Sequence, residues 1–268
     1  MSDWFSFRIA IQTMKDYWKM TLILSLLFMG MAAMYSGMYP AFKDMMAELG
    51  SEMMEQFNFI PGAEDMASYI GFLNVELYQM FWLLILGILV GFIAASLVSK
   101  EVEAKTIDLL MANPISRKQI VIEKYLGLIP TILIVNFSTM IVVYGMTLAI
   151  NEEINLGYLF MTHVVSIPYF LAVASIGLLV SVIIDEKMKA SIIMIAIIVG
   201  MFVFRSISLM VPDYEAIGSL SLTNYFNPYD ILKSGTVDAV GVAVLIVVIF
   251  ECLLVSMFIF ERRDINVS

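Results

Sequence analysis

Long apolar segments alternate with short polar segments along this chain of 268 residues. Six apolar runs are long enough to cross the hydrocarbon of a bilayer, about 30 Å thick, as α-helices that rise about 1.5 Å per residue. We expect these runs to be membrane-spanning helices with approximate bounds 20–40, 77–98, 126–150, 159–184, 188–210 and 239–260. The pattern therefore predicts an all-α membrane protein in which residues 1–268 form one domain.

Two amphipathic segments flank the first run. Residues 1–19 place apolar and aromatic side chains, Trp4 and Trp18 among them, on one helical stripe with basic residues beside it. This pattern predicts a helix that lies in the membrane interface, and the alternative is an ordinary lead-in to the first span. Residues 41–57 alternate apolar with acidic positions, so we expect an amphipathic outer helix that ends by Pro61-Gly62. We interpret its acidic residues as a solvated face.

The segment 100–125 is the longest charged stretch between two apolar runs. Its first half has apolar residues at helical spacing, and Asn113-Pro114 then breaks the pattern, because a residue before proline disfavours helical geometry. Ser116 can cap a new helix that leads into the third span. We therefore expect a helix, a sharp turn and a second helix, held just outside the membrane.

Composition and charge indicate on which side of a membrane segment 100–125 lies. Hydrophobic residues make up 61% of the chain and charged residues only 15%, whereas soluble domains average about 25% charged residues. Twelve of the fifteen Lys and Arg residues fall on the side that holds both termini and segment 100–125. Because cytoplasmic loops are enriched in Lys and Arg, we expect that side in the cytoplasm of a multi-pass plasma-membrane protein. The net charge of −9 argues against a nucleic-acid partner.

The sequence lacks the patterns of catalytic and cofactor sites. It has no Gly-rich phosphate-binding loop, so we expect no ATP site in this chain. One histidine, His163, and one cysteine, Cys252, are too few for a His-rich metal site or an internal disulfide. We expect His163 to be a hydrogen-bonding residue near the outer end of the fourth span. An enzyme is therefore disfavoured, and we expect neither a cofactor nor a metal in this chain.

A few polar residues lie inside the apolar runs. Glu251 is near the middle of the sixth run, where a carboxylate is costly unless it faces the bundle interior, finds a partner or is protonated. Asn136 lies at a comparable depth and can hydrogen-bond it. The two are candidates for the transport pathway, and the alternative is a helix-packing or subunit-interface contact. We interpret Arg205, at a span end, as an anchor that extends its head group to the interface.

Two motifs resemble a known family. The order Glu101-x-Glu103-x-Lys105-Thr106-x-Asp108-x-Leu110, followed by Pro114-x-Ser116-Arg117 and Lys124, is similar to the signature E-x-E-x-G-T-x-E-x-L…P-x-S-R…K of permease subunits of type-2 ABC exporters. The ending Phe260-Glu261-Arg262-Arg263-Asp264 resembles that family's F-x-R-R-D. Lys105 departs from the signature, because the family usually has glycine there, and the departure concerns the local backbone shape.

The resemblance implies a pathway formed by two permease subunits, as a homodimer or a heterodimer, and driven by two separate ATP-binding subunits. ATP and Mg²⁺ would bind to those partners and not to this chain. The residues that the resemblance assigns to coupling with the ATP-binding subunit are Glu101, Glu103, Lys105, Thr106, Asp108, Leu109, Leu110, Pro114, Ser116 and Arg117.

Two other functions stay open at this point. A self-contained secondary transporter or channel would need paired ionisable residues or broken helices within the membrane, and Glu251 is nearly alone there. A membrane scaffold or sensor without transport would use the acidic outer segment 41–76 as its ligand site.

Overall fold

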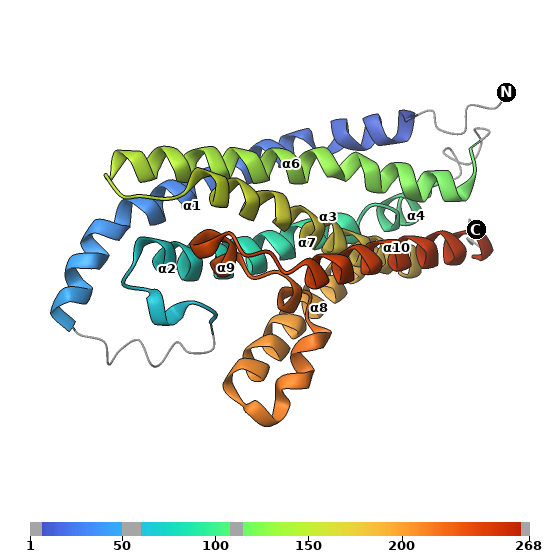
Figure 1. The fold of residues 1–268 in the computed structure, drawn as a ribbon. Coiled ribbons are helices and arrows are strands. Elements are labelled where there is room, and N and C mark those ends of the chain that lie inside the picture. Colours follow the sequence, from blue (N-terminus) through green and yellow to red (C-terminus); the bar gives the residue numbers. More distant parts are fainter. Residues whose placement is uncertain (1–6, 50–59, 108–114, 264–268) are drawn as a thin grey trace.

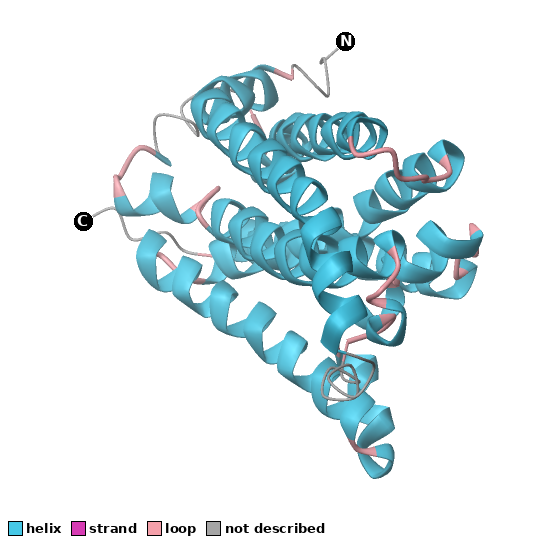
Figure 2. Ribbon diagram, turned by 90° about the vertical axis from the view of Figure 1, so that its left-hand side faces the viewer, coloured by secondary structure: helices cyan, strands magenta, loops and turns pink. Residues whose placement is uncertain are grey.

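The computed structural model describes residues 7–49, 60–107 and 115–263, and this part of the chain consists of helices and loops without a β-strand (Figure 2). Six helical segments within it are long and apolar enough to cross a membrane, which confirms the expected number. The elements in chain order are α1 (Arg8–Leu49), η2 (Ala63–Asp65), α2 (Tyr69–Leu73), η3 (Asn74–Leu86), α3 (Gly87–Ala95), α4 (Ser99–Glu103), α6 (Arg117–Ala149), α7 (Leu156–Ile183), α8 (Lys187–Met210), η4 (Pro212–Leu220), η5 (Leu222–Tyr225), α9 (Pro228–Ser234) and α10 (Ala239–Arg262).

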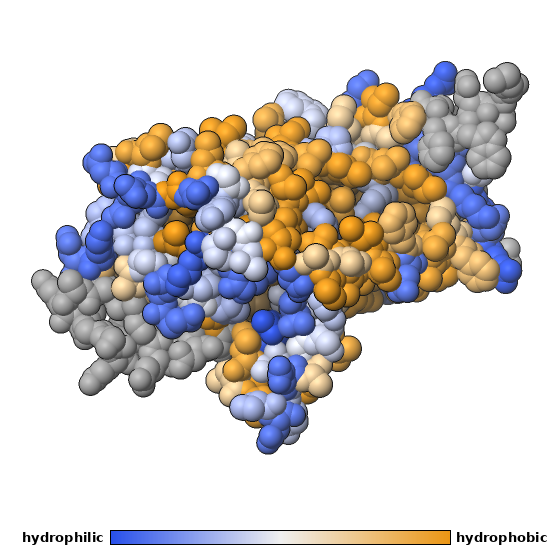
Figure 3. Space-filling model, in the orientation of Figure 1, coloured by the Kyte–Doolittle hydropathy of each residue, from blue (hydrophilic) through white to orange (hydrophobic). Residues whose placement is uncertain are grey.

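The long helices form a bundle, and both termini lie at the same end of it (Figure 1). α1 packs along α6, while α7 lies inside the bundle against α3, α6 and α10. α8 leans away from the other helices, and η4 folds back against it (Figure 1). Apolar residues form a broad band across the middle of the face in Figure 3, and most polar residues gather towards its two ends. This distribution is that of a protein that spans a membrane.

α1 is one continuous helix of 42 residues. At about 1.5 Å per residue it is about 63 Å long, roughly twice the thickness of the hydrocarbon layer. The expectation of a separate interfacial helix was therefore wrong for residues 8–19, and residues 41–49 likewise continue the first span through Pro40. Segment 8–19 contains neither glycine nor proline, so nothing in it interrupts the helix. The rest of the two predicted amphipathic helices, 1–6 and 50–57, lies outside the described residues.

The orientation of the first turns of α1 agrees with the predicted stripe. Ile11 and Trp18 are 47% and 53% exposed, so the apolar stripe faces away from the bundle. The opposite side of the helix is buried, and Gly127 of α6 allows the close approach: a Cβ at this position would lie 2.6 Å from the carbonyl oxygen of Ala10. Small residues at the contact between two membrane helices favour this kind of packing.

The hydropathy pattern predicted that the second span begins near residue 77, but it begins at Tyr69. Ser68 starts the helix, because its hydroxyl accepts a hydrogen bond from the N–H of Gly71. The middle of the span, η3, is π-helical, a geometry that is rare and is frequently found at functional sites. Asn74, Tyr78 and Trp82 in η3 are buried, which explains why polar residues are tolerated in this span.

The remaining connections are short or contain helical turns of their own. α7 ends at Ile183 and α8 begins at Lys187, so only three residues connect these two spans. η4, η5 and α9 occupy most of the last connection, and Asp238 then caps α10 by accepting a hydrogen bond from the N–H of Val240. At the break between α3 and α4, the hydroxyl of Ser181 on α7 accepts hydrogen bonds from two consecutive backbone N–H groups.

Candidate functional site

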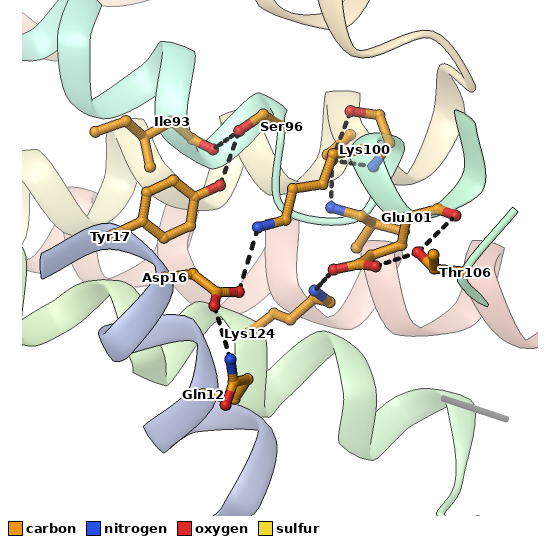
Figure 4. A network of polar contacts seen from close by, with 12 residues as sticks. Gln12, Asp16, Tyr17, Ile93, Ser96, Lys100, Glu101, Thr106 and Lys124 are labelled. Carbon is orange, nitrogen blue, oxygen red and sulfur yellow. Dashed lines mark hydrogen bonds and ion pairs between the residues drawn. The ribbon is translucent and has the colours of Figure 1, made fainter. Parts of the chain in front are cut away.

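Polar side chains of α1, α4, α6 and the residues that follow α3 and α4 meet in one group (Figure 4), at the end of the bundle that holds both termini (Figure 1). We call this group the polar cluster, and its members are Asp16, Tyr17, Ser96, Lys100, Glu101, Thr106 and Lys124. It lies where the chain leaves the second span and where the segment after α4 begins. The contacts of the polar cluster therefore attach the segment that follows α4 to the membrane helices.

An ion pair joins Lys124 of α6 to Glu101 of α4, with 2.9 Å between Nζ and Oε1. The Lys124 side chain is only 4% exposed. The other carboxylate oxygen of Glu101 accepts a hydrogen bond from the Thr106 hydroxyl. Burial by itself would raise the pKa of Glu101, but Lys124 and Thr106 together bring it below its ordinary value. Breaking a buried pair would leave an uncompensated charge, so the pair holds α4 firmly against α6.

The turn after α4 depends on Lys105. Its φ of 54° is left-handed, a conformation that glycine adopts without strain and that other residues adopt rarely. Around it, the N–H of Lys105 donates to the carbonyl of Val102, and the N–H of Thr106 donates to that of Glu101. This pair of hydrogen bonds is the Schellman arrangement that ends a helix. The backbone shape expected for glycine at this position is therefore present with lysine in its place.

The first helix of the predicted helix-turn-helix is interrupted at residues 104–106, and its continuation from residue 108 lies outside the described residues. α4 comprises five residues and ends at Glu103, because the left-handed residue two positions later stops it. The second helix begins as predicted: the hydroxyl of Ser116 accepts a hydrogen bond from the N–H of Gln119, and α6 starts at Arg117. The predicted turn at Asn113-Pro114 lies outside the described residues.

α1 joins the same cluster through Asp16 and Tyr17. Nζ of Lys100 lies 3.7 Å from a carboxylate oxygen of Asp16 and 4.6 Å from the centre of the Tyr17 ring. The Tyr17 hydroxyl is hydrogen-bonded to the hydroxyl of Ser96 at 3.0 Å. The start of α4 is thus attached to α1 as well as to α6.

A buried carboxylate fixes the beginning of α1. Glu123 of α6 has no exposed side-chain surface, and its Oε2 accepts hydrogen bonds from the N–H groups of Ile9 and Ala10 at 2.9 and 3.4 Å. The first N–H groups of a helix have no partner within the helix, and the positive end of the helix dipole favours an anion there. Glu123 therefore caps α1, although it lies more than one hundred positions away from it in the sequence.

Two further residues of the same region connect α8 and α10. A carboxylate oxygen of Glu103 accepts the backbone N–H of Lys187, the first residue of α8, at 2.8 Å. Arg117 donates to the carbonyls of Phe260 and Arg263 at the end of α10, and its guanidinium lies over the Phe260 ring. Arg263 in turn pairs with Asp185 between α7 and α8. α8 and α10, like α1, are thereby connected to the segment that contains α4 and the start of α6.

Comparison with known proteins identifies the family. Residues 11–265 match the family described as "ABC-2 family transporter protein". The chain belongs to the ABC-2 transporter family. No curated protein matches the chain. As an ABC-2 family member with six candidate spans, it is a multi-pass membrane protein and a membrane component of an ABC transporter.

Some of the predicted coupling residues of this ABC-2 transporter chain already have partners inside the chain. Glu101 bonds to both Thr106 and Lys124, while Glu103 bonds to α8 and Arg117 to the end of α10. Lys105 and Ser116 are exposed. The other four, Asp108, Leu109, Leu110 and Pro114, lie outside the described residues. The prediction that these ten residues contact an ATP-binding subunit stays a prediction.

Asn136 and Glu251, the two candidates within the membrane, do not form the hydrogen bond with each other that the sequence allowed. Asn136 is buried and bonds to His163, whose carbonyl and ring nitrogen it contacts, and to the hydroxyl of Ser166. Glu251 instead lies on the exposed face of α10 and forms no hydrogen bond or ion pair within the described part of the chain. Of the possibilities given for Glu251, it does not face the interior of its own chain, because α10 places that side outward. Its role in the pathway or at a subunit interface stays a prediction.

His163 is hydrogen-bonded, as predicted, but its partners lie inside the bundle. It is fully buried, its Nε2 is 3.0 Å from the Tyr78 hydroxyl, and the Trp82 ring lies 5.1 Å from its own ring centre. The histidine is therefore an internal link between η3, α6 and α7, not an interfacial residue. Among the described residues, no group of three or more His, Cys, Asp or Glu side chains is placed to hold a metal ion.

Glu123 and Asp16 are functional candidates that sequence reasoning missed. The sequence patterns singled out neither residue. One available signal was the Glu123-Lys124 pair at the start of a long apolar run, where both side chains must find partners if the helix is packed. The sequence does not identify those partners, because they lie more than twenty positions away along the chain.

Proposed function

We propose that this chain is the permease subunit of an ATP-driven exporter, that it forms the pathway with a second permease subunit, and that separate ATP-binding subunits drive it. The observation that carries the proposal is the attachment of the segment around α4 to the membrane helices, in a chain of the ABC-2 family. Both termini and the polar cluster would face the cytoplasm of the plasma membrane, because twelve of fifteen Lys and Arg residues lie on that side.

The mechanical argument starts from the connections at the polar cluster. A force applied to a flexible loop is lost in the loop, whereas a segment held at both ends transmits it. Here the Glu101–Lys124 ion pair fixes the beginning of the segment, and the contacts of Arg117 fix its end. Closure of an ATP-binding subunit against this segment would therefore move α1, α6, α8 and α10 together.

The second permease subunit is supported by the exposed face of α10. Leu254 and Phe258 are 61% and 52% exposed on this helix, and Glu251 lies on the same exposed side. A carboxylate facing lipid at that depth is unfavourable, whereas one facing a second subunit or a water-filled path between subunits can be hydrated or paired. An interface along α10 would remove this conflict.

Lys105 offers the sharpest test of contact with an ATP-binding subunit. The tagged chain is co-expressed with an ATP-binding subunit and purified in mild detergent, and the retained subunit and its ATP hydrolysis are measured. Lys105→Glu reverses an exposed charge and should lower both at least about fivefold, the usual scale of coupling between sites. Lys105→Gly removes the side chain but keeps the left-handed turn, so it separates side-chain contact from backbone shape.

Lys189→Glu is the matched control, because Lys189 is an exposed lysine at the α7–α8 turn of the same bundle end. If Lys105→Glu, Lys189→Glu and the unaltered chain retain equal amounts of the ATP-binding subunit, Lys105 does not contribute to the contact. Failure of any ATP-binding subunit to associate, together with proton-driven flux through the purified chain, would replace the proposal with a secondary transporter.

The Glu101–Lys124 ion pair makes the stability of the chain depend on pH. Because the pKa of Glu101 is lowered in the folded protein, the stability that its carboxylate contributes is present above the ordinary value of 4.5 and is lost as the pH falls through the lower folded-state pKa. We expect the difference in melting temperature between the wild type and Glu101→Gln to be largest near neutral pH and to shrink in acid. A difference that is constant from neutral pH to pH 3 would contradict the ionised pair.

A further inference from the structure

The fifth span carries an arginine whose guanidinium is not neutralised. Arg205 lies in α8, and its Nε is buried without a hydrogen-bond partner. None of the ion pairs within the described residues involves it. This differs from the anchor that we expected from the sequence, which would extend its whole head group into water. An ionisable residue inside a span usually marks a functional site.

Arg205 borders a narrow pocket between α8, η3 and η5, with a cavity of about 20 Å³ and about 460 Å³ of empty space when its open mouth is included. The polar side chains that line the pocket besides Arg205 are Gln79, Ser206, Thr223 and Asn227. All of them carry donor groups, and no carboxylate is among the lining residues. The Ser206 hydroxyl already donates to the carbonyl of Phe202, the Asn227 amide uses one hydrogen towards Asp230, and the Thr223 hydroxyl is hydrogen-bonded to that of Ser221, from which it can accept while it donates to a ligand. Gln79 uses one amide hydrogen towards Asn74 at 3.4 Å, so the other is free for a ligand. A cation surrounded by amide and hydroxyl donors is suited to an anion.

The position of the guanidinium is set by the chain that folds back over α8. At Gly218 in η4 a Cβ would lie 2.5 Å from the Ser208 hydroxyl oxygen and 3.6 Å from Nη1 of Arg205. A side chain at this position would therefore collide with α8 next to the arginine. Glycine here brings η4 against α8 and limits the directions in which the arginine can extend.

The surroundings on α8 indicate what else the ligand carries. Phe204, Ile207 and Met210 are exposed by 41%, 36% and 64%, although they lie in the same turns as Arg205. α8 is a candidate span with only 17% of its central residues buried, so this surface faces lipid or a second subunit. A ligand with an apolar tail would cover this surface while its charged head reaches the arginine. An ion without a tail would leave it uncovered.

We propose that this pocket, hereafter the Arg205 pocket, binds the phosphate headgroup of an anionic amphiphile, with Arg205 as the charge partner and Gln79 and Thr223 as hydrogen-bond donors. The phosphate forms charge-assisted hydrogen bonds with the guanidinium, which removes its unpaired buried N–H. The tail lies along the exposed apolar side of α8. The site does not depend on the coupling role of the polar cluster.

Native mass spectrometry of the purified full chain in detergent tests the site. The probes are short-chain phosphatidic acid, phosphatidylcholine with the same tails, and inorganic phosphate. We expect phosphatidic acid to bind more tightly than phosphatidylcholine, because the choline cation opposes the arginine. Arg205→Met should weaken phosphatidic acid at least about tenfold, and Arg205→Lys should weaken it less because lysine keeps the charge but loses the planar fork.

Arg262→Met is the matched control, since it removes an arginine at the end of α10 that stacks on Phe258 and is remote from the pocket lining. Thr223→Val keeps the charge and the side-chain shape, so it reports on the hydrogen bond even if an Arg205 variant folds poorly. We expect it to weaken binding about threefold or more. Melting temperatures in the same detergent check folding, and the ATP-binding subunit is absent from every arm.

The arms distinguish the sources of the anion. Phosphatidic acid binding that depends on Arg205 and resists millimolar inorganic phosphate identifies a lipid-like headgroup. Displacement by inorganic phosphate, again dependent on Arg205, identifies an anion site that needs no tail and overturns the amphiphile. Equal binding by the unaltered chain, Arg205→Met and Thr223→Val overturns the site altogether.

Discussion

α7 and α10 are both strongly apolar helices of similar length, yet the protein places them in opposite environments. In α7, 67% of the residues in the central window are buried, whereas in α10 only 11% are. α10 is nevertheless the more apolar of the two by hydropathy. In a water-soluble protein the more apolar helix would be the more buried one.

The difference follows from the solvent. Lipid tails are as apolar as leucine side chains, so burying leucine within a membrane protein gains little, while small and polar side chains gain close packing and hydrogen bonds. α7 carries Thr162, His163, Ser166 and Gly177 at buried positions, and α10 exposes large aliphatic and aromatic side chains. The central helix of this bundle is thus recognised by its polar and small residues.

Gly177→Ala in α7 tests the close packing and should have the largest effect. The added Cβ would lie 2.7 Å from the Cβ of Ala94 and 2.9 Å from the carbonyl oxygen of Gly91, so α3 and α7 must move apart. We expect a loss of about 1–3 kcal/mol, measured as a lower melting temperature in detergent. Gly145→Ala is the control, because nothing lies within 4 Å of its Cβ position and alanine favours the helix by about 1 kcal/mol. Equal effects at the two sites would contradict the packing argument.

Asn136→Leu tests the hydrogen bonds that hold α6 to α7. The substitution keeps the branched outline of the side chain, with a larger volume, but leaves the ring of His163 and the hydroxyl of Ser166 without this partner. We expect a loss of about 1–2 kcal/mol in thermal unfolding of the chain alone. Glu251→Gln, on the exposed face of α10, should change the same measurement by less than about 0.5 kcal/mol. A larger effect of Glu251→Gln would show that α10 packs differently.

Arg117→Met tests how α10 is held, since so little of that helix is buried. Arg117 donates to two backbone carbonyls at the end of α10, and the substitution should release this end at a cost of about 1 kcal/mol. We expect faster hydrogen exchange in residues 256–263 with little change in α7. Lys118→Met is the matched control, because its ion pair with Glu261 is half exposed on both sides and contributes little. Unchanged exchange in Arg117→Met would assign the attachment of α10 to other contacts.

Leu254→Ala should have the smallest effect on the isolated chain, less than about 0.5 kcal/mol, because the side chain is 61% exposed. The same substitution distinguishes lipid from protein as the neighbour of α10. If a second permease subunit covers this face, the fraction of paired subunits in cross-linking or native mass spectrometry should fall. An unchanged fraction would leave α10 facing lipid.

The number of spans and the end of the bundle that gathers the basic residues were predictable from the sequence. Hydropathy and charge are properties of each segment by itself, and the membrane sorts segments by them whatever their neighbours are. The start of α6 at Ser116 was predictable for the same reason, because a cap acts within a few residues. The family resemblance at residues 101–124 also rested on local order, and the family match confirms it.

Only the tertiary structure decided which polar residues meet. Asn136 bonds to His163 and not to Glu251, Glu123 caps α1 from a distant helix, and Lys105 holds a turn usually made by glycine. Each of these depends on which face of a helix turns towards which neighbour, and a rotation of one helix by a single residue would exchange the partners. The sequence therefore determined what enters the membrane, and packing among distant segments determined which side chains act together, because hydrogen bonds and ion pairs need atoms within about 3–4 Å while hydropathy needs only composition.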